Sequence, residues 1–332
     1  MTAPTPPPRD PSAPAASKTD EAESSISRED SPGTGENSVH RPPNWVLPVV
    51  IGLLSTVWGS TYFVIREGLH DLPPFTSAAV RFCLASAVMA VLCAMLSKKE
   101  GGTRPTFSLV LVMGLGNFGI CYGLVYWSET TLPSGMVSVL WATFPMLVAA
   151  VGLYGTRREP LRPAQWVGFG VGFLGVLLLF STDVWALGAA SVITALITLL
   201  GPMVGALGQT WVKRFGEGVS SLQLNRDGMI VGAAFLAVLA ATTEDFGDAR
   251  WTPRAVGSVV YLALAGTVLT FGLYYWALRW WDSYRMSIIA YLTPVLALTL
   301  GTLAGGEPLG WGTVAGTGLV LGGVGLVLRR SR

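Results

Sequence analysis

The sequence predicts an all-α polytopic membrane protein with ten transmembrane helices, arranged as two inverted five-helix repeats, with both termini cytoplasmic. Three observations support this fold class: ten long apolar segments, an uneven distribution of Lys and Arg between the loops, and an internal repeat. Hydrophobic residues make up 51% of the 332 positions and charged residues only 13%, about half of the ~25% found in soluble domains. Lipid is therefore the expected solvent for most of the chain.

Residues 1–43 differ from the rest in composition. They are rich in Pro, Ser and acidic residues and contain only Ile26 and Val39 from the large aliphatic set. Such a segment buries too little apolar surface to offset the entropy of ordering it. We expect a disordered cytoplasmic tail that is not a secretory signal, because a short apolar core is missing near its start.

The ten apolar segments each approach the ~20 residues that a helix needs to cross the hydrocarbon core. Helices satisfy their backbone hydrogen bonds internally, as this solvent requires. The segments cover approximately residues 45–65, 75–96, 107–127, 134–154, 164–181, 186–212, 222–242, 255–277, 286–304 and 309–328.

Basic residues in the intervening loops predict the orientation, because short cytoplasmic loops carry the excess of Lys and Arg. One set of alternate loops and ends holds Arg41, Lys98, Lys99, Arg104, Arg157, Arg158, Arg162, Lys213, Arg214, Arg329, Arg330 and Arg332. The other set holds only Arg66, Arg250, Arg254, Arg279 and Arg285. Both termini are therefore predicted to be cytoplasmic, which an even number of spans also requires.

An internal repeat relates the two halves of the chain. YWSETTLPSGMVSVLWATFPMLVAA, from Tyr126, aligns with YWALRWWDSYRMSIIAYLTPVLALT, from Tyr275, and places Pro145 opposite Pro294. REPLRPAQWVGFGVGFLGV then aligns with GEPLGWGTVAGTGLVLGGV. Because each half contains an odd number of spans, the second copy enters the membrane from the opposite face. Many secondary transporters have such inverted repeats and place their sites where the repeats meet.

These segments resemble the EamA domains of the bacterial drug/metabolite transporter superfamily. WGSTYFVIREGL is similar to the first-helix signature, PPFTSAAVRF to the start of the second helix with its arginine, and the two Gly-rich segments to the domain ends. The resemblance covers about residues 45–328 and suggests one EamA-like five-helix repeat over 44–182 and another over 183–329. It implies transport of amino acids, related metabolites or drugs.

Two prolines near the middle of their spans are candidates for the transport pathway. Proline removes one helical hydrogen bond, so Pro145 should free the carbonyl of Trp141, and Pro294 that of Ala290. Ser138, Trp141 and Pro145 share one helix face by their spacing. We expect this face to line a cavity, with a packing kink as the alternative.

Polar and aromatic residues elsewhere add further candidates. Asn117 lies near the middle of its span, followed by Tyr122, and Tyr291 lies one turn before Pro294. A buried amide in hydrocarbon needs a partner, which is either the solute or a neighbouring helix. We interpret these residues as cavity candidates for an amphipathic organic solute.

Trp58, Tyr62 and Arg66 recur every four residues and form one stripe along the first helix. Either they anchor the helix at the membrane interface, or Trp58 and Tyr62 line the cavity and Arg66 marks its rim. Arg81 lies about six residues into the second span. The sequence favours a long side chain that reaches outward to Glu67 or Asp71 over direct contact with substrate, so Arg81 is a second gate or rim candidate.

Several classes of function are disfavoured. The spans carry no Asp or Glu at their centres, so the carboxylate typical of ion coupling is not visible. The two histidines lie in the tail and a loop, and no phosphate-binding motif occurs. We therefore expect no enzyme, metal, cofactor or nucleic-acid partner.

The sequence thus predicts a multi-pass protein of the cell (inner) membrane that exports amino acids or related metabolites by alternating access. A multidrug exporter is the alternative, and a non-transport membrane protein is a weaker one. Small-xxx-small faces in the fifth and tenth spans predict close helix packing. That packing is either within one chain or in a homodimer through these Gly-rich helices.

Overall fold

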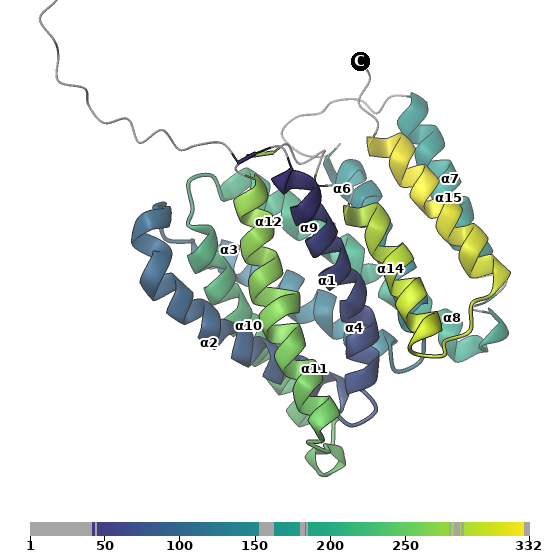
Figure 1. Ribbon diagram of the computed structural model, residues 1–332, viewed down its shortest axis with the longest axis horizontal. Helices are drawn as coiled ribbons and strands as arrows, with labels where there is room; N and C mark the ends of the chain where they lie inside the picture. Colours follow the sequence, from purple (N-terminus) through teal and green to yellow (C-terminus); the bar gives the residue numbers. More distant parts are fainter. Residues whose placement is uncertain are drawn as a thin grey trace, which may run out of the picture. The chain divides into compact units, whose positions relative to one another are not determined.

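The computed structural model describes residues 42–43, 45–152, 163–179, 183, 185–278, 280–281, 286 and 289–328. Within these ranges the chain is helical apart from its connections and one isolated bridge between Thr103 and Val219 (Figure 1). Most of the predicted tail, and the predicted Arg157, Arg158, Arg279 and Arg285 loop positions, lie outside the described residues.

The all-helical prediction is confirmed for the described part of the chain. The helices of the first half are α1 Val46–Gly68, α2 Pro74–Glu100, α3 Phe107–Leu111, η1 Val112–Cys121, α4 Tyr122–Ser128, α5 Ser134–Trp141, α6 Phe144–Gly152 and α7 Pro163–Leu179. Those of the second half are α8 Ala189–Thr198, α9 Leu200–Phe215, α10 Ser221–Thr243, η3 Phe246–Asp248, α11 Pro253–Ala263, η4 Leu264–Leu269, α12 Thr270–Leu278, α14 Ile289–Leu303 and α15 Trp311–Leu328.

Seven helical segments in the described ranges are long and apolar enough to cross a membrane, counting consecutive helices such as α3, η1 and α4 as one. Three shorter apolar helices, α7, α14 and α15, correspond to the remaining predicted spans. The structure thus establishes a multi-span helical protein, while the count of ten and the orientation of the termini stay predictions.

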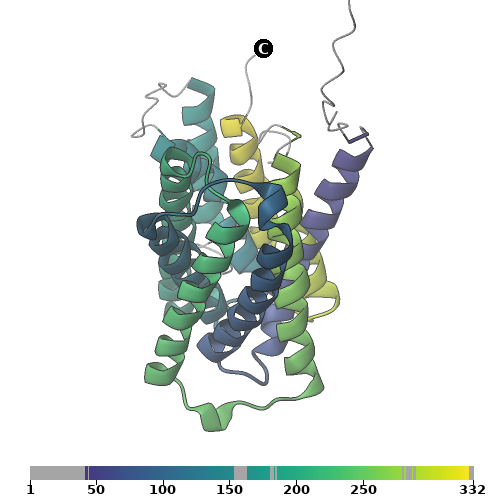
Figure 2. The same cartoon turned by 90° about the vertical axis from the view of Figure 1, so that its left-hand side faces the viewer.

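Helices α2 and α10 pack together and run in opposite directions, so that each helix end meets the start of the other. Glu244, just after α10, accepts hydrogen bonds from the backbone N–H groups of Phe75 and Thr76 at the start of α2. Glu100, at the end of α2, accepts bonds from the first turn of α10. A carboxylate at a helix N-terminus satisfies orphan donors and complements the dipole. The two acids therefore hold α2 and α10 as one unit, whose connection onward from α10 to α11 is visible in Figure 2.

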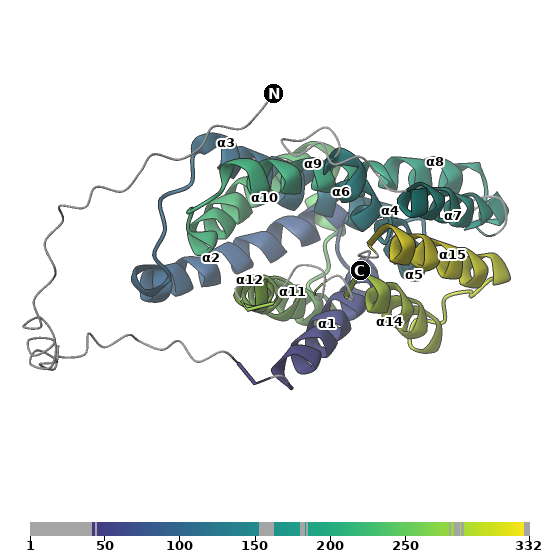
Figure 3. The same ribbon diagram turned by 90° about the horizontal axis from the view of Figure 1, so that it is seen from above.

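Helices α7 and α15 form a second close pair and lie side by side in Figures 1 and 3. Their backbones touch at glycines: a Cβ atom on Gly168 would lie 2.7 Å from the carbonyl oxygen of Gly323, and one on Gly175 would lie 2.7 Å from that of Gly316. Small residues allow helices to approach this closely in lipid. The predicted small-residue faces thus meet within the chain at Gly168 and Gly316, whereas a Cβ on Gly318 or Gly322 would have nothing within 4 Å. A homodimer is not shown.

Helix α1 packs against α14 and α11. A Cβ atom on Gly59 would lie only 2.7 Å from the Cβ of Leu296, so this glycine permits close approach of α14. Ser60 and Tyr261 share a hydrogen bond of 2.7 Å between their hydroxyl groups. The first helix of the chain is in this way joined to two helices of the second half.

The two proline-containing spans differ from each other. The first breaks at Ala142 and Thr143, between α5 and α6, with Pro145 in the first turn of α6. In the second, α14 continues through Pro294, which is buried. Both prolines lack the N–H that would bond four residues back, but only the first is accompanied by a complete helix break.

Two π-helical segments occupy equivalent places in the halves. Adding the repeat offset of 149 residues to η1 (112–121) gives residues 261–270, which include η4. A π-helix shifts the backbone bonding by one residue and occurs frequently at functional sites. The segments lie in the third spans of the two predicted repeats. Residues of η4 contact Arg81, the centre of the candidate site.

Candidate functional site

Arg81 is the centre of the candidate site. It lies two turns into α2, where it is 0% exposed. Its guanidinium donates hydrogen bonds to Thr267 Oγ1 at 3.1 Å and to the Gly266 carbonyl oxygen at 3.3 Å, both in η4. A third bond, of 3.4 Å, reaches the Tyr126 hydroxyl. The side chain thus joins the first predicted repeat to the π-helical segment of the second.

Aromatic rings cover the guanidinium of Arg81. Its central carbon lies 4.8 Å from the ring centroid of Tyr122 and 5.3 Å from that of Phe82. Ring faces attract a cation, more so when water is excluded. None of the hydrogen-bond acceptors of Arg81 in the described structure is a carboxylate, although a buried charge is normally paired with an opposite one. Arg81 is therefore a buried cation held by neutral groups.

The predicted outward reach of Arg81 to Glu67 or Asp71 is wrong. Asp71 instead accepts bonds from Arg254 Nε at 2.8 Å and from Thr252 at 2.6 Å, and Glu67 lies 3.8 Å from Arg254. Arg81 points inward because η4 presents a hydroxyl and a carbonyl to it at hydrogen-bonding distance. The acids of this loop are thus satisfied by Arg254, a cation from the second half of the chain.

A second buried charge-bearing group, Glu129, follows α4 directly. Its side chain is 0% exposed, and neither carboxylate oxygen has a hydrogen-bond partner in the described structure. Burial raises the pKa of this carboxyl well above its usual range, Glu307 adds to the rise, and Arg66 opposes it. Glu129 was not predicted from the sequence, because it follows the end of a span and such positions are normally exposed.

Arg66 bonds the backbone of the link that contains Glu129. It lies in the last turn of α1 and donates to the backbone carbonyl oxygens of Glu129 and, at 3.4 Å, Leu132. Tyr62, one turn earlier, packs against the main core, as does Tyr122. The structure therefore brings the predicted Tyr62, Tyr122 and Arg66 together at the link between α4 and α5.

A chain of aromatic rings extends from this centre toward α1 and α12. Phe82 contacts Phe118 at a centroid distance of 5.5 Å, and Phe118 contacts Phe271 at 5.6 Å. Phe271 in turn contacts Trp58 at 6.1 Å. Trp58 thus reaches the site through two phenylalanines that sequence reasoning did not single out, since an isolated Phe in an apolar span carries no distinguishing signal.

Other predicted residues lie apart from Arg81. Asn117 is partly buried in η1, and its amide makes no hydrogen bond within the described part of the chain. Ser138 is buried and donates to the carbonyl of Gly135 in its own helix. Because serine satisfies itself in this way, that face of α5 contributes less polar surface than its spacing suggested.

Trp141 and Tyr291 also lie away from Arg81. The ring of Trp141 packs on α9, where a Cβ on Gly201 would lie 2.8 Å from it, and its buried Nε1 has no partner in the described structure. Tyr291 lies beside α15, with its hydroxyl 3.2 Å from the position of a Cβ on Gly325. The roles proposed for these residues and for both prolines remain predictions.

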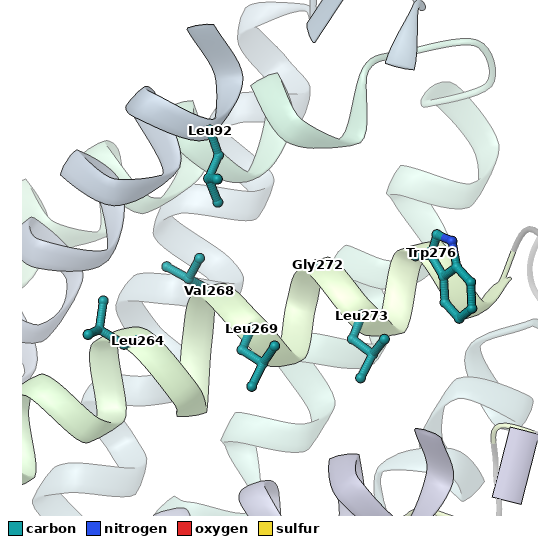
Figure 4. A pocket seen from close by; sticks show the side chains of 7 residues that line it. All are labelled: Leu92, Leu264, Val268, Leu269, Gly272, Leu273 and Trp276. Atoms are coloured by element: carbon teal, nitrogen blue, oxygen red, sulfur yellow. The ribbon is translucent and has the colours of Figure 1, made fainter. Parts of the chain in front are cut away.

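Two cavities lie outside this centre. One, of about 500 Å³, is a groove between α2 and the helix from η4 to α12, with only apolar side chains and Gly272 along it; Leu92 points from α2 toward that helix (Figure 4). The other, of about 680 Å³, lies among α2, α4, α8 and α10 and includes Trp127, Thr130 and Glu244. The lining of the first groove is apolar enough to accommodate lipid chains. Neither cavity is lined by Arg81 or Glu129, because both side chains are enclosed in this conformation.

Several helices long and apolar enough to span a membrane surround an enclosed polar centre, which is the arrangement of a polytopic membrane protein. The sequence profile described as the EamA-like transporter family matches residues 46–181 and 192–329. Because these matches cover more than half of the chain, the protein belongs to this family. The resemblance noted in its motifs is confirmed.

Curated relatives agree with the family. The uncharacterized transporter YoaV of Bacillus subtilis is 24% identical over 84% of this chain and 96% of its own length. The uncharacterized inner membrane transporter YedA of Escherichia coli K12 is 28% identical over 77% of this chain and 82% of its own. A probable amino-acid metabolite efflux pump of Salmonella typhimurium is 25% identical over 82% and 91%.

The fold also has a solved counterpart. A crystal structure with 17% sequence identity superposes with a TM-score of 0.61 and covers 86% of this chain and 98% of that one. At this identity the similarity concerns the fold alone.

Proposed function

We propose that the protein is a secondary transporter that exports amino acids or related small organic metabolites by alternating access. It acts in the cell (inner) membrane as a ten-span protein of two inverted five-helix repeats with cytoplasmic termini. The similarity to an amino-acid metabolite efflux pump supports the substrate class. The relatives cited above are named as transporters or as a probable efflux pump, which supports a protein that is not an enzyme.

One observation carries this proposal: Arg81 is a fully buried cation whose acceptors are all neutral. Arg is the side chain best suited to bind a carboxylate through two parallel hydrogen bonds. An amino acid or organic acid would supply the missing anion and exchange weak contacts for a charge-assisted pair. The surrounding tyrosine and phenylalanine rings would receive its apolar part.

Alternating access supplies the route to this enclosed centre. Helices α2 and α10 form one unit through their reciprocal acid caps, and α7 and α15 form another through their glycine contacts. Movement at the π-helical segments and at the break between α5 and α6 would open the site to one side at a time. Arg66, which spans from α1 to the α4–α5 link, serves as the rim contact that must release.

A multidrug exporter is the second candidate, because the aromatic chain from Phe82 to Trp58 offers stacking surface without fixed polar contacts. Purified protein in liposomes, tested with radiolabelled amino acids, organic acids and cationic drugs, separates the two. Flux of amino acids with no flux of drugs supports the proposal. Folded protein that moves none of these solutes, under counterflow conditions, contradicts it.

A further inference from the structure

Glu129 is a buried acid that the proposed carboxylate site does not use. It lies between α4 and α5, where the side chain is fully covered and both oxygens lack hydrogen-bond partners in the described structure. Buried side-chain oxygens are nearly always bonded, so an unpaired carboxyl group in a transporter requires an explanation. The position of Glu129 beside Arg81 suggests that the carboxyl group acts in transport.

The charged and titratable groups that face Glu129 come from several elements. They are Tyr62 and Arg66 of α1, Arg81 of α2, Tyr126 of α4 and Glu307, which follows α14. The guanidinium of Arg66 bonds the backbone carbonyl of Glu129 and not its carboxylate, although the backbone N–H of Arg66 also favours the charged carboxylate. Both cations attract the carboxylate, yet within the described structure neither guanidinium forms a hydrogen bond with it.

Glu307 is the instructive contrast. It accepts hydrogen bonds from the backbone N–H groups of Ser134 at 2.8 Å and Gly135 at 3.2 Å, at the start of α5. Helix N-terminal donors stabilise a negative charge, and Glu307 accepts two of them. Neither carboxylate oxygen of Glu129 has a hydrogen-bond partner in the described structure, and the negative charge of Glu307 lies nearby. Glu129 is therefore suited to hold a proton.

Exposure to water reverses that preference. When a buried carboxyl group without donors reaches water, hydration stabilises its charged form, and the proton leaves. The closed conformation therefore holds one more proton than a conformation in which the site is open, and proton binding is linked to the conformational equilibrium. A cation that pairs with the carboxylate would displace the proton in the same way.

We propose that Glu129 is the proton-binding site of the transporter, and that a proton and the ammonium group of the substrate occupy it in turn. The inference rests on the proposed function. In the exchange, the O–H bond of the acid breaks, the proton passes to water on the open side, and the carboxylate forms an ion pair with the ammonium group. The substrate carboxylate then lies at Arg81. The empty carrier returns with a proton, so one proton moves against each amino acid.

The test uses full-length protein in liposomes with a mixture of radiolabelled L-amino acids. Wild type is compared with Glu129→Gln. This variant keeps the size and hydrogen-bonding capacity of the side chain but cannot bind and release a proton. Asp248→Asn, which removes an exposed acid in η3, is the matched control. Size-exclusion profiles show that each variant is folded. Two activities are measured separately, with the membrane potential clamped at zero. The first is counterflow without a pH gradient, and the second is net uptake driven by a pH gradient.

For wild type and Asp248→Asn, exchange of one proton per solute across about one pH unit supports roughly tenfold accumulation. Glu129→Gln should accumulate no solute, and its counterflow should be slower than that of wild type, because the ammonium group of the solute loses its ion pair. Wild-type net uptake that does not respond to the pH gradient, or a folded Glu129→Gln variant that still accumulates solute, overturns the inference. Each of these leaves the proposed function standing, because wild type still transports. Absence of wild-type flux overturns the proposed function itself.

A second measurement does not depend on flux. Addition of the amino-acid mixture to wild-type protein in weakly buffered detergent should release about one proton per bound solute, detected with a pH indicator. Glu129→Gln should release none, whereas Asp248→Asn should match wild type. Equal release from Glu129→Gln and wild type would assign the proton to another group.

Discussion

Substitution of Gly323 by Ala tests the close packing of α15 against α7. The new Cβ would lie 2.6 Å from the carbonyl oxygen of Gly168 and from the backbone nitrogen of Gly172. Ordinary contact begins at 3.4 Å, so the helices must separate locally by about 0.8 Å. The clashing atoms are backbone and cannot rotate away. Overpacking of this kind costs about 1–3 kcal/mol, which corresponds to a fall in melting temperature of roughly 2–12 °C.

The assay is thermal unfolding of detergent-solubilised protein, followed by tryptophan fluorescence and by size exclusion after heating. Gly318→Ala is the matched control on the same helix, because a Cβ there has nothing within 4 Å. Alanine also favours a helix over glycine by about 0.8–1 kcal/mol, so the control should melt at or above the wild-type temperature. If Gly323→Ala is as stable as wild type, or if Gly318→Ala is equally destabilised, the packing argument is refuted.

Three further predictions concern charged groups. Arg81→Lys should reduce the initial rate of amino-acid counterflow at least about tenfold, since a bidentate fork is lost, whereas the exposed Arg104→Lys should not change it. Hydrogen bonds from Arg254 and Thr252 lower the pKa of Asp71 from 3.8 to about 2. This stabilisation is present above about pH 4 and lost as the pH falls toward 2, so Asp71→Asn should show a smaller fall in melting temperature over that interval. Glu244→Gln should lose about 1 kcal/mol from the start of α2, measured by the same unfolding assay, and an unchanged melting temperature would argue against the cap.

The multi-span helical fold and the family were predictable from the sequence. Lipid requires long apolar segments with internally satisfied backbones, and such segments can be recognised without knowledge of their neighbours. The repeat around Pro145 and Pro294 was also predictable, because aligning the two halves of the sequence reveals it without a structure. The structure added a difference that the repeat did not predict, a break between α5 and α6 that has no counterpart in α14.

The candidate site was predicted only in part. Tyr62 and Arg66 were predicted from the stripe on the first helix, and Tyr122 from its position after Asn117. In the structure these three residues lie near one another. Arg81 was recognised but given the wrong direction, because its distance from the helix end allowed a reach toward loop acids. The structure directs it inward, where the π-helical η4 presents an acceptor carbonyl and hydroxyl. A shift in helical bonding leaves no mark in hydrophobic periodicity.

Composition, span length and repeats are properties of the order of residues, and they identify the chain as an all-α membrane protein built from a duplicated unit. Which side chains are enclosed together depends on how the helices pack. Glu129 lies in a link between helices, where sequence predicts exposure, yet α1 and the segment after α14 cover it. Burial and pairing depend on contacts between residues more than 150 positions apart, such as Glu307 with Ser134 and Arg81 with Thr267. Those contacts exist only once the two halves have packed.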